Sequence, residues 1–129
     1  MSAAGARALT IRNVALAVLG ACVLVVKAAY QGPLEEAVYA WAGNFAVSFA
    51  LYFALLNTTV RWSRPRLHAA GLTLLVVEAF EATNGFGVLS NVYDSSDFIA
   101  NAAGVSLAVL VDIATAAALA RRGTAATGK

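Results

Sequence analysis

Four polar side chains lie between two very apolar segments of this sequence. Glu78 and Glu81 end one apolar segment, and Asp97 and Asn101 begin the next. Carboxylates accept charge-assisted hydrogen bonds from ammonium and hydroxyl groups, and an amide both donates and accepts. These residue types therefore suit a polar ligand-binding pocket. Paired carboxylates also bind hard divalent cations, so a metal-dependent reaction is the catalytic alternative.

The composition places this pocket in a membrane. Of the 129 residues, 60% are hydrophobic and 12% are charged, whereas soluble domains have roughly 45–50% and about 25%. So little polar surface cannot enclose a water-soluble core, and unpaired backbone groups are not tolerated in lipid. We therefore expect an all-α membrane protein. The net charge of +2 does not predict a nucleic-acid partner, because the basic residues do not share one solvated face.

Apolar segments predict a bundle of four transmembrane helices in a single domain, residues 1–129. A hydrocarbon core of about 30 Å takes roughly 20 helical residues to cross. Glycine, proline and short polar runs separate the apolar segments from one another. The predicted helices cover residues 14–30, 37–60, 65–83 and 97–120.

The basic residues predict the orientation of the bundle. They gather near both termini and in the connection between the second and third helices. Basic loops face the cytoplasm by the positive-inside rule, so we expect both termini on that side of a bacterial cytoplasmic (inner) membrane, as a multi-pass protein. The acidic residues then lie toward the outer side, together with Lys27. The basic set comprises Arg7, Arg12, Arg61, Arg64, Arg66, Arg121, Arg122 and Lys129.

Helix geometry places the four polar side chains at one depth. At about 1.5 Å of rise per residue, Glu78 and Glu81 lie roughly 8 and 3 Å below the outer end of their helix. On the same scale, Asn101 lies about 6 Å below Asp97. The second helix offers a comparable polar face through Trp41, Asn44, Ser48 and Tyr52. One stripe of the fourth helix contains Asp97, Asn101, Gly104, Ala108 and Asp112.

Each charge inside a span needs a partner, because an Asp at the bilayer centre costs about 2.5–3.5 kcal/mol even on lenient scales. A structural ion pair with Lys27 is the alternative interpretation of Glu78 and Glu81, since its predicted height matches theirs. One lysine neutralises only one carboxylate, however. The second must be protonated, reach water or bind a positive group.

Asp112 lies deeper, and no basic residue is expected at its level. The most economical interpretation is a protonated Asp112 hydrogen-bonded across helices to Tyr52 or Thr73. Structural roles are open for the outer residues too. Asp94 and Asp97 match a capping box at the start of the fourth helix. The predicted ligand-binding residues are Glu78, Glu81, Asp97 and Asn101, with Lys27, Asp112, Tyr52 and Asp94 as proton or structural partners.

These motifs resemble the VanZ-like family of small bacterial four-span membrane proteins. Glu78 and Glu81 match the end of that family's third helix, and the Asp-x-x-x-Asn-x-x-Gly run from Asp97 to Gly104 matches the start of its fourth. Members usually carry Gln where this chain has Glu81. The resemblance implies a cell-envelope role and a link to glycopeptide resistance, because the founding member is linked to teicoplanin resistance. A neighbouring group of four-span proteins with paired acids is a similar match.

Three function classes follow from these residues, and binding is favoured over catalysis. The first is a protein whose outer-leaflet pocket binds a cationic or polyhydroxylated envelope ligand, such as a lipid headgroup. The second is a divalent-metal-dependent enzyme acting on a lipid or cell-wall precursor. The third is a small proton- or ion-coupled carrier, which would need homo-oligomeric partners because four short helices leave little room for a path. We predict no cofactor and assign no metal site.

Overall fold

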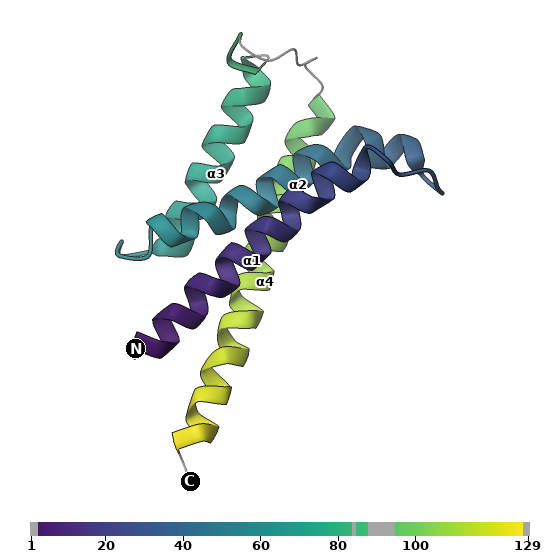
Figure 1. The fold of residues 1–129 in the computed structure, drawn as a ribbon. Helices are drawn as coiled ribbons and strands as arrows, with labels where there is room; N and C mark the ends of the chain where they lie inside the picture. Colours follow the sequence, from purple (N-terminus) through teal and green to yellow (C-terminus); the bar gives the residue numbers. More distant parts are fainter. Residues whose placement is uncertain (1–2, 84, 88–94, 128–129) are drawn as a thin grey trace.

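In the part of the chain that the structure describes, four α-helices make up the fold (Figure 1). The computed structural model describes residues 3–83, 85–87 and 95–127. Within these residues there is no strand, so the prediction of an all-α protein is confirmed. The helices are α1 (Ala3–Lys27), α2 (Glu35–Thr58), α3 (Pro65–Ala82) and α4 (Ser95–Thr127), and a short 3₁₀ helix, η1 (Gly85–Gly87), follows α3.

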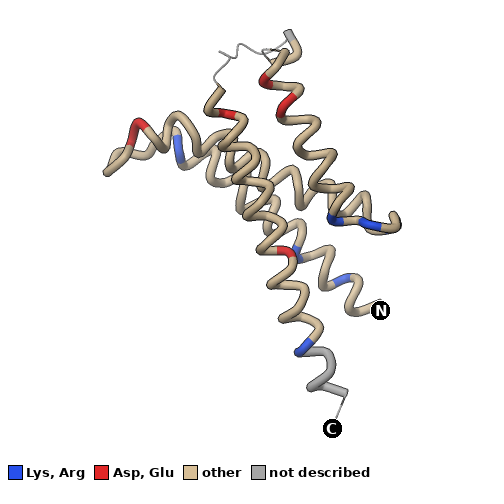
Figure 2. The backbone as a smooth tube through the Cα atoms, turned by 180° about the vertical axis from the view of Figure 1, so that it is seen from behind, with Lys and Arg blue, Asp and Glu red and all other residues tan. Residues whose placement is uncertain are grey.

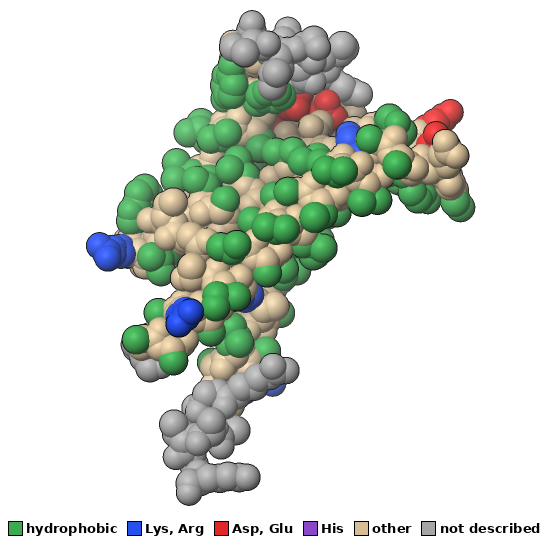
Figure 3. All heavy atoms as spheres, viewed as in Figure 1, with side chains coloured by type: hydrophobic (Ala, Val, Ile, Leu, Met, Phe, Trp, Pro, Cys, Tyr) green, Lys and Arg blue, Asp and Glu red, His purple; other side chains and the backbone are tan. Residues whose placement is uncertain are grey.

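Three of these helices are long and apolar enough to cross a membrane. They are α1, α2 and the Ser95–Arg121 part of α4. The helix α3 has 18 residues and is not in this set, so the fourth span stays a prediction. Hydrophobic side chains cover the visible faces of α1 and α2 (Figure 3). Val25 and Val26, for example, are 76% and 65% exposed, which fits a surface against lipid.

Local sequence explains where the helices begin. Pro65 is at the first position of α3, where its missing N–H and fixed φ favour a helix start. Glu35 and Glu36 are in the first turn of α2, and Asp97 is in the first turn of α4. Acids are stabilised there by the positive end of the helix dipole. The position of Asp97 agrees with the capping motif predicted for the start of the fourth helix.

The outer helices extend further than hydropathy predicts. The helix α1 begins at Ala3 rather than at residue 14, and α4 continues to Thr127 rather than stopping near residue 120. Both extensions are rich in Ala and Arg, which are strong helix formers. Hydropathy marks the apolar part of a helix, whereas the backbone stays helical as long as propensity allows.

The helix α2 is the centre of the bundle, because it contacts α1, α3 and α4. The hairpin of α1 and α2 crosses α3 and α4 (Figure 1). Within the described residues α1 has few contacts with α4 and none with α3. The core therefore lies between α2, α3 and α4. It consists of Phe49, Tyr52, Phe53, Leu56, Ala69, Val105 and Ala108.

Small residues bring the helix backbones together. A Cβ atom on Gly104 would overlap the backbone of Phe45, so α2 and α4 are in backbone contact at this point. A Cβ on Gly20 would come within 2.9 Å of Ala50 on α2 and 3.0 Å of the Ala46 carbonyl oxygen. Close approach through small residues is how membrane helices pack without a hydrophobic driving force.

Candidate functional site

The predicted pocket residues face the interior of the bundle. Glu81, Asp97 and Asn101 are 2%, 9% and 1% exposed. Glu78 is half-buried, and its Oε2 atom is out of contact with solvent. We call these four residues the acid–amide cluster. The burial excludes a bundle in which the two glutamates point to lipid or bulk water.

Asn101 is held by one hydrogen bond and has one unpaired donor. Ser48 Oγ on α2 donates to Asn101 Oδ1 at 2.8 Å. Asn101 Nδ2 is buried and has no hydrogen-bond partner, and the same is true of Glu78 Oε2. The Asn101 side chain interacts with the Glu78 carboxylate, although its Nδ2 and Glu78 Oε2 themselves have no hydrogen-bond partner. A donor and an acceptor thus lie close together, both buried and both unsatisfied.

Two further carboxylates belong to the acid–amide cluster. Glu81 is close enough to Glu78 for the two charges to repel each other. Asp97 is the third residue of α4, as the capping-box motif predicts. Asp94, the other half of that motif, lies outside the described residues. Ser48 on α2 shows that the polar face predicted for the second helix reaches the stripe of the fourth.

Lys27 does not neutralise the cluster, so that interpretation is wrong. Lys27 Nζ donates to the Tyr39 carbonyl oxygen at 3.5 Å and lies over Gly43 on α2. Within the described residues it forms no ion pair with Glu78 or Glu81. The physical reason is helix adjacency: Lys27 ends α1, which packs on α2 and has no contact with α3.

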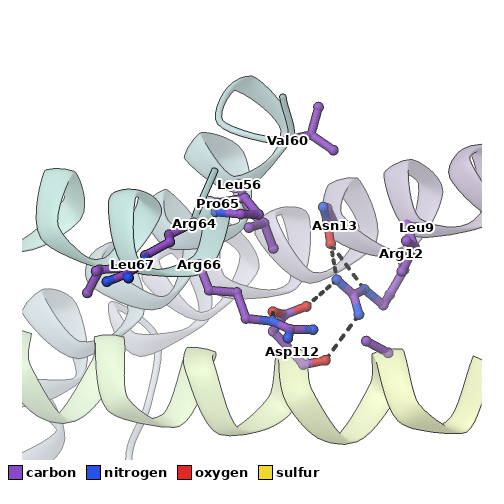
Figure 4. A pocket seen from close by; sticks show the side chains of 11 residues that line it. Leu9, Arg12, Asn13, Leu56, Val60, Arg64, Pro65, Arg66, Leu67 and Asp112 are labelled. Carbon is purple, nitrogen blue, oxygen red and sulfur yellow. Dashed lines mark hydrogen bonds and ion pairs between the residues drawn. The ribbon is translucent and has the colours of Figure 1, made fainter. Parts of the chain in front are cut away.

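Asp112 is the centre of a second polar site, between two arginines (Figure 4). Arg12 Nη2 is 2.5 Å from its Oδ1, and Arg66 Nε is 2.5 Å from its Oδ2. Tyr52 donates its hydroxyl to Oδ2 at 3.3 Å. The predicted Tyr52 partner is confirmed, but the expectation of a protonated Asp112 without a basic partner is wrong. Thr73 is not a partner either, because its hydroxyl donates to its own helix at Ala69.

Arg12 links α1 to α4 through its guanidinium group and, by way of Asn13, to α2. Its Nε and Nη2 donate to Asn13 Oδ1 at 3.1 and 2.6 Å. Its Nη1 donates to the Asp112 carbonyl oxygen at 3.2 Å and to Thr115 Oγ1 at 3.0 Å. Asn13 Nδ2 in turn donates to Asn57 Oδ1 on α2 at 2.9 Å. We call Arg12, Asn13, Arg66 and Asp112 the arginine–aspartate network.

The sequence-based interpretation missed Arg12, Asn13 and Arg66 as partners of a buried carboxylate. It placed Arg12 outside the first span, which was predicted to begin only at residue 14, and it counted Arg66 with the basic connection at the cytoplasmic surface. Arg12 is instead well inside α1, and its side chain is 12% exposed. The length of the arginine side chain could have indicated this position, because the side chain spans about the same distance as several residues of helical rise. The guanidinium group can therefore lie deeper in the bundle than its own Cα atom.

A cavity of about 470 Å³ opens beside the arginine–aspartate network. None of the acid–amide cluster residues lines it, so this cavity is separate from the cluster. Apart from Lys27, the basic residues lie away from the acidic residues of α3 and of the start of α4 (Figure 2). Its walls are mostly apolar. The lining residues are Leu9, Arg12, Asn13, Leu56, Val60, Arg64, Pro65, Arg66, Leu67, Asp112 and Ala116.

Comparisons with family models, with curated proteins and with solved structures find no match for this chain. The resemblance to the VanZ-like family therefore stays a prediction. In the part of the chain that the structure describes, no group of three or more His, Cys, Asp or Glu side chains is placed to hold a metal ion.

Proposed function

We propose that this chain is an integral membrane protein of the bacterial cell envelope that binds a polyhydroxylated ligand in the acid–amide cluster. The observation that carries the proposal is the pair of buried, unsatisfied atoms, Glu78 Oε2 and Asn101 Nδ2. Leaving such atoms unpaired costs about 1–3 kcal/mol each. A ligand that pairs with both recovers this free energy on binding.

The types of the two atoms select the ligand chemistry. Glu78 Oε2 accepts a hydrogen bond, and Asn101 Nδ2 donates one. A hydroxyl group donates and accepts, so a sugar or polyol satisfies both atoms. An ammonium group carries donors only, and would leave the Asn101 donor unpaired. The geometry therefore favours a polyhydroxylated ligand over a purely cationic one.

The neighbouring acids extend the same recognition. Glu81 and Asp97 are buried, and carboxylates accept strong hydrogen bonds from hydroxyl groups. A ligand with several adjacent hydroxyls would contact more than one member of the cluster. The VanZ-like resemblance adds a link to glycopeptide resistance to this proposal. The ion pairs of Asp112 with two arginines count against the carrier alternative, in which Asp112 would exchange protons.

Sugar binding is expected to stabilise the purified protein in detergent. Glucose at 100 times its dissociation constant would add about 2.7 kcal/mol to the free energy of unfolding, and ethylammonium chloride would add less. Thermal unfolding of the wild type, Glu78→Gln and Asn101→Leu, each with both probes, measures this. Both variants should lose most of the glucose-dependent rise in unfolding temperature.

A matched control separates binding from solvent exclusion, because sugars raise the stability of any folded protein to some extent. Glu36→Gln removes an exposed acid of α2 that is not part of the cluster. Its glucose-dependent rise should equal that of the wild type. The same rise in all four proteins would mean solvent exclusion alone and would overturn the proposal.

The proposal places the acid–amide cluster in the outer leaflet, supported by the basic residues at the other end of the bundle. We expect a membrane-impermeant maleimide to label Gln31→Cys in intact cells and to leave Ser63→Cys unlabelled. Both positions are exposed in connections at opposite ends of α2. A Cys22→Ala background removes the single native thiol. Labelling of Ser63→Cys alone would reverse the orientation.

A further inference from the structure

The N-terminus of α3 is the positive end of its helix dipole, and it has no side-chain cap. Arg64, the residue before the helix, makes no side-chain capping bond, and the first turn contains no acidic residue. The partial positive charge at a helix N-terminus favours an anion there. This end of α3 also lines the cavity of about 470 Å³, through four consecutive residues, Arg64, Pro65, Arg66 and Leu67.

Arg66 offers further hydrogen-bond donors beside the same cavity. Its Nε is occupied by Asp112, but within the described residues no hydrogen bond is formed by its Nη1 or Nη2. Its side chain is 49% exposed, so these groups are accessible. Arg12, by contrast, uses all of its guanidinium nitrogens within the bundle. Two arginines on one aspartate leave one positive charge uncompensated at the cavity.

The rest of the cavity wall is apolar. It comes from all four α-helices and the α2–α3 connection, so a ligand with a hydrocarbon part would be enclosed on several sides. A free phosphate ion would gain nothing from these apolar side chains. Burial of an acyl chain against them is favoured by about 25 cal/mol per Å² of apolar area removed from water. The apolar lining residues are Leu9, Leu56, Val60, Pro65, Leu67 and Ala116.

We propose that this cavity binds the phosphodiester group of an anionic phospholipid, with Arg66 as the residue that recognises it. The guanidinium fork of Arg66 matches two phosphate oxygens, and the uncapped start of α3 adds a favourable field. The first part of the acyl chain packs against Leu9, Leu56 and Val60. Basic cavities between membrane helices bind anionic headgroups by the same physics. The site is independent of the acid–amide cluster.

The test compares phosphatidylglycerol with phosphatidylcholine, which share the phosphodiester group but differ in net charge, because the choline cation compensates the phosphate and leaves less for Arg66 to neutralise. Native mass spectrometry of the detergent-solubilised wild type should show a preference for phosphatidylglycerol. Arg66→Gln should lower that preference about tenfold, the factor that one charge-assisted hydrogen bond supplies. Arg61→Gln is the control, because Arg61 is an exposed arginine of the same connection that does not line this cavity. An equal loss in both variants would mean general surface charge and would overturn the proposal.

Two further arms keep the result decisive if Arg66→Gln does not fold. Ala116→Phe fills the cavity from α4 while leaving the pairing of Arg66 with Asp112 in place. It should lose bound phosphatidylglycerol, and retention of the lipid would contradict the proposal. Inorganic phosphate, added at the concentration of the lipid, should not compete. Effective competition would identify a free phosphate site instead of a lipid site.

Discussion

Replacing Asp112 with leucine is expected to destabilise the bundle by about 3–5 kcal/mol, the usual cost of removing one partner from a buried ion pair. The Asp112 side chain is 2% exposed and accepts from both Arg12 and Arg66. Without it, Arg12 keeps its charge in a site where its own side chain is 12% exposed. The free energy of unfolding in detergent micelles, measured by denaturant titration, gives the loss directly.

A double variant tests whether the loss comes from the ion pair itself. Arg12→Leu alone should also destabilise the protein, because it leaves Asp112 with Arg66 only. Arg12→Leu combined with Asp112→Leu should cost less than the sum of the two single variants, since no buried charge is then left unpaired. Strictly additive losses would contradict the structural role that we assign to this pair.

Gly104→Ala is expected to destabilise the protein by about 1–3 kcal/mol, the range for overpacking a tight interface. The added Cβ would overlap the Phe45 carbonyl group on α2. Backbone atoms cannot move aside as a flexible side chain can, so α2 and α4 would have to separate. Thermal unfolding of the purified variant in detergent measures the effect. The Ser48–Asn101 hydrogen bond also joins α2 to α4, so separation of these helices would weaken it.

Gly71→Ala is the matched control for this prediction. Gly71 is exposed within α3, and nothing lies within 4 Å of a Cβ built on it. Alanine there should raise stability by up to about 1 kcal/mol, because it is the better helix former. If both variants changed stability in the same direction and by the same amount, helix propensity alone would explain Gly104→Ala.

Helical periodicity was enough to predict which face of the fourth helix is buried. All of Asp97, Asn101, Ala108 and Asp112 are at most 9% exposed, as expected for one stripe repeating every three to four residues. The polar face of the second helix was predicted for the same reason, and two of its members, Ser48 and Tyr52, bond to that stripe. Polar and small residues in an apolar helix mark the packed side, because the lipid side does not accept them.

Helix adjacency could not be predicted in this way. The height of Lys27 suggested Glu78 or Glu81 as a partner, but height does not say which helices are neighbours. In the structure α1 packs on α2, which separates Lys27 from α3. The partners of Asp112 were missed for a related reason: depth was assigned from Cα positions, whereas Arg12 and Arg66 reach inward through their long side chains.

The arginine–aspartate network joins the first helix to the last. Asp112 is separated from Arg12 by 100 positions in the chain, so during synthesis the arginine enters the lipid long before its acidic partner exists. The helix α4 then carries a carboxylate that has no counter-ion until it reaches α1 and α3. We therefore expect the ion pairs of α4 to form only after α1 and α3 are in place, so that the last helix depends on the earlier ones for a stable position.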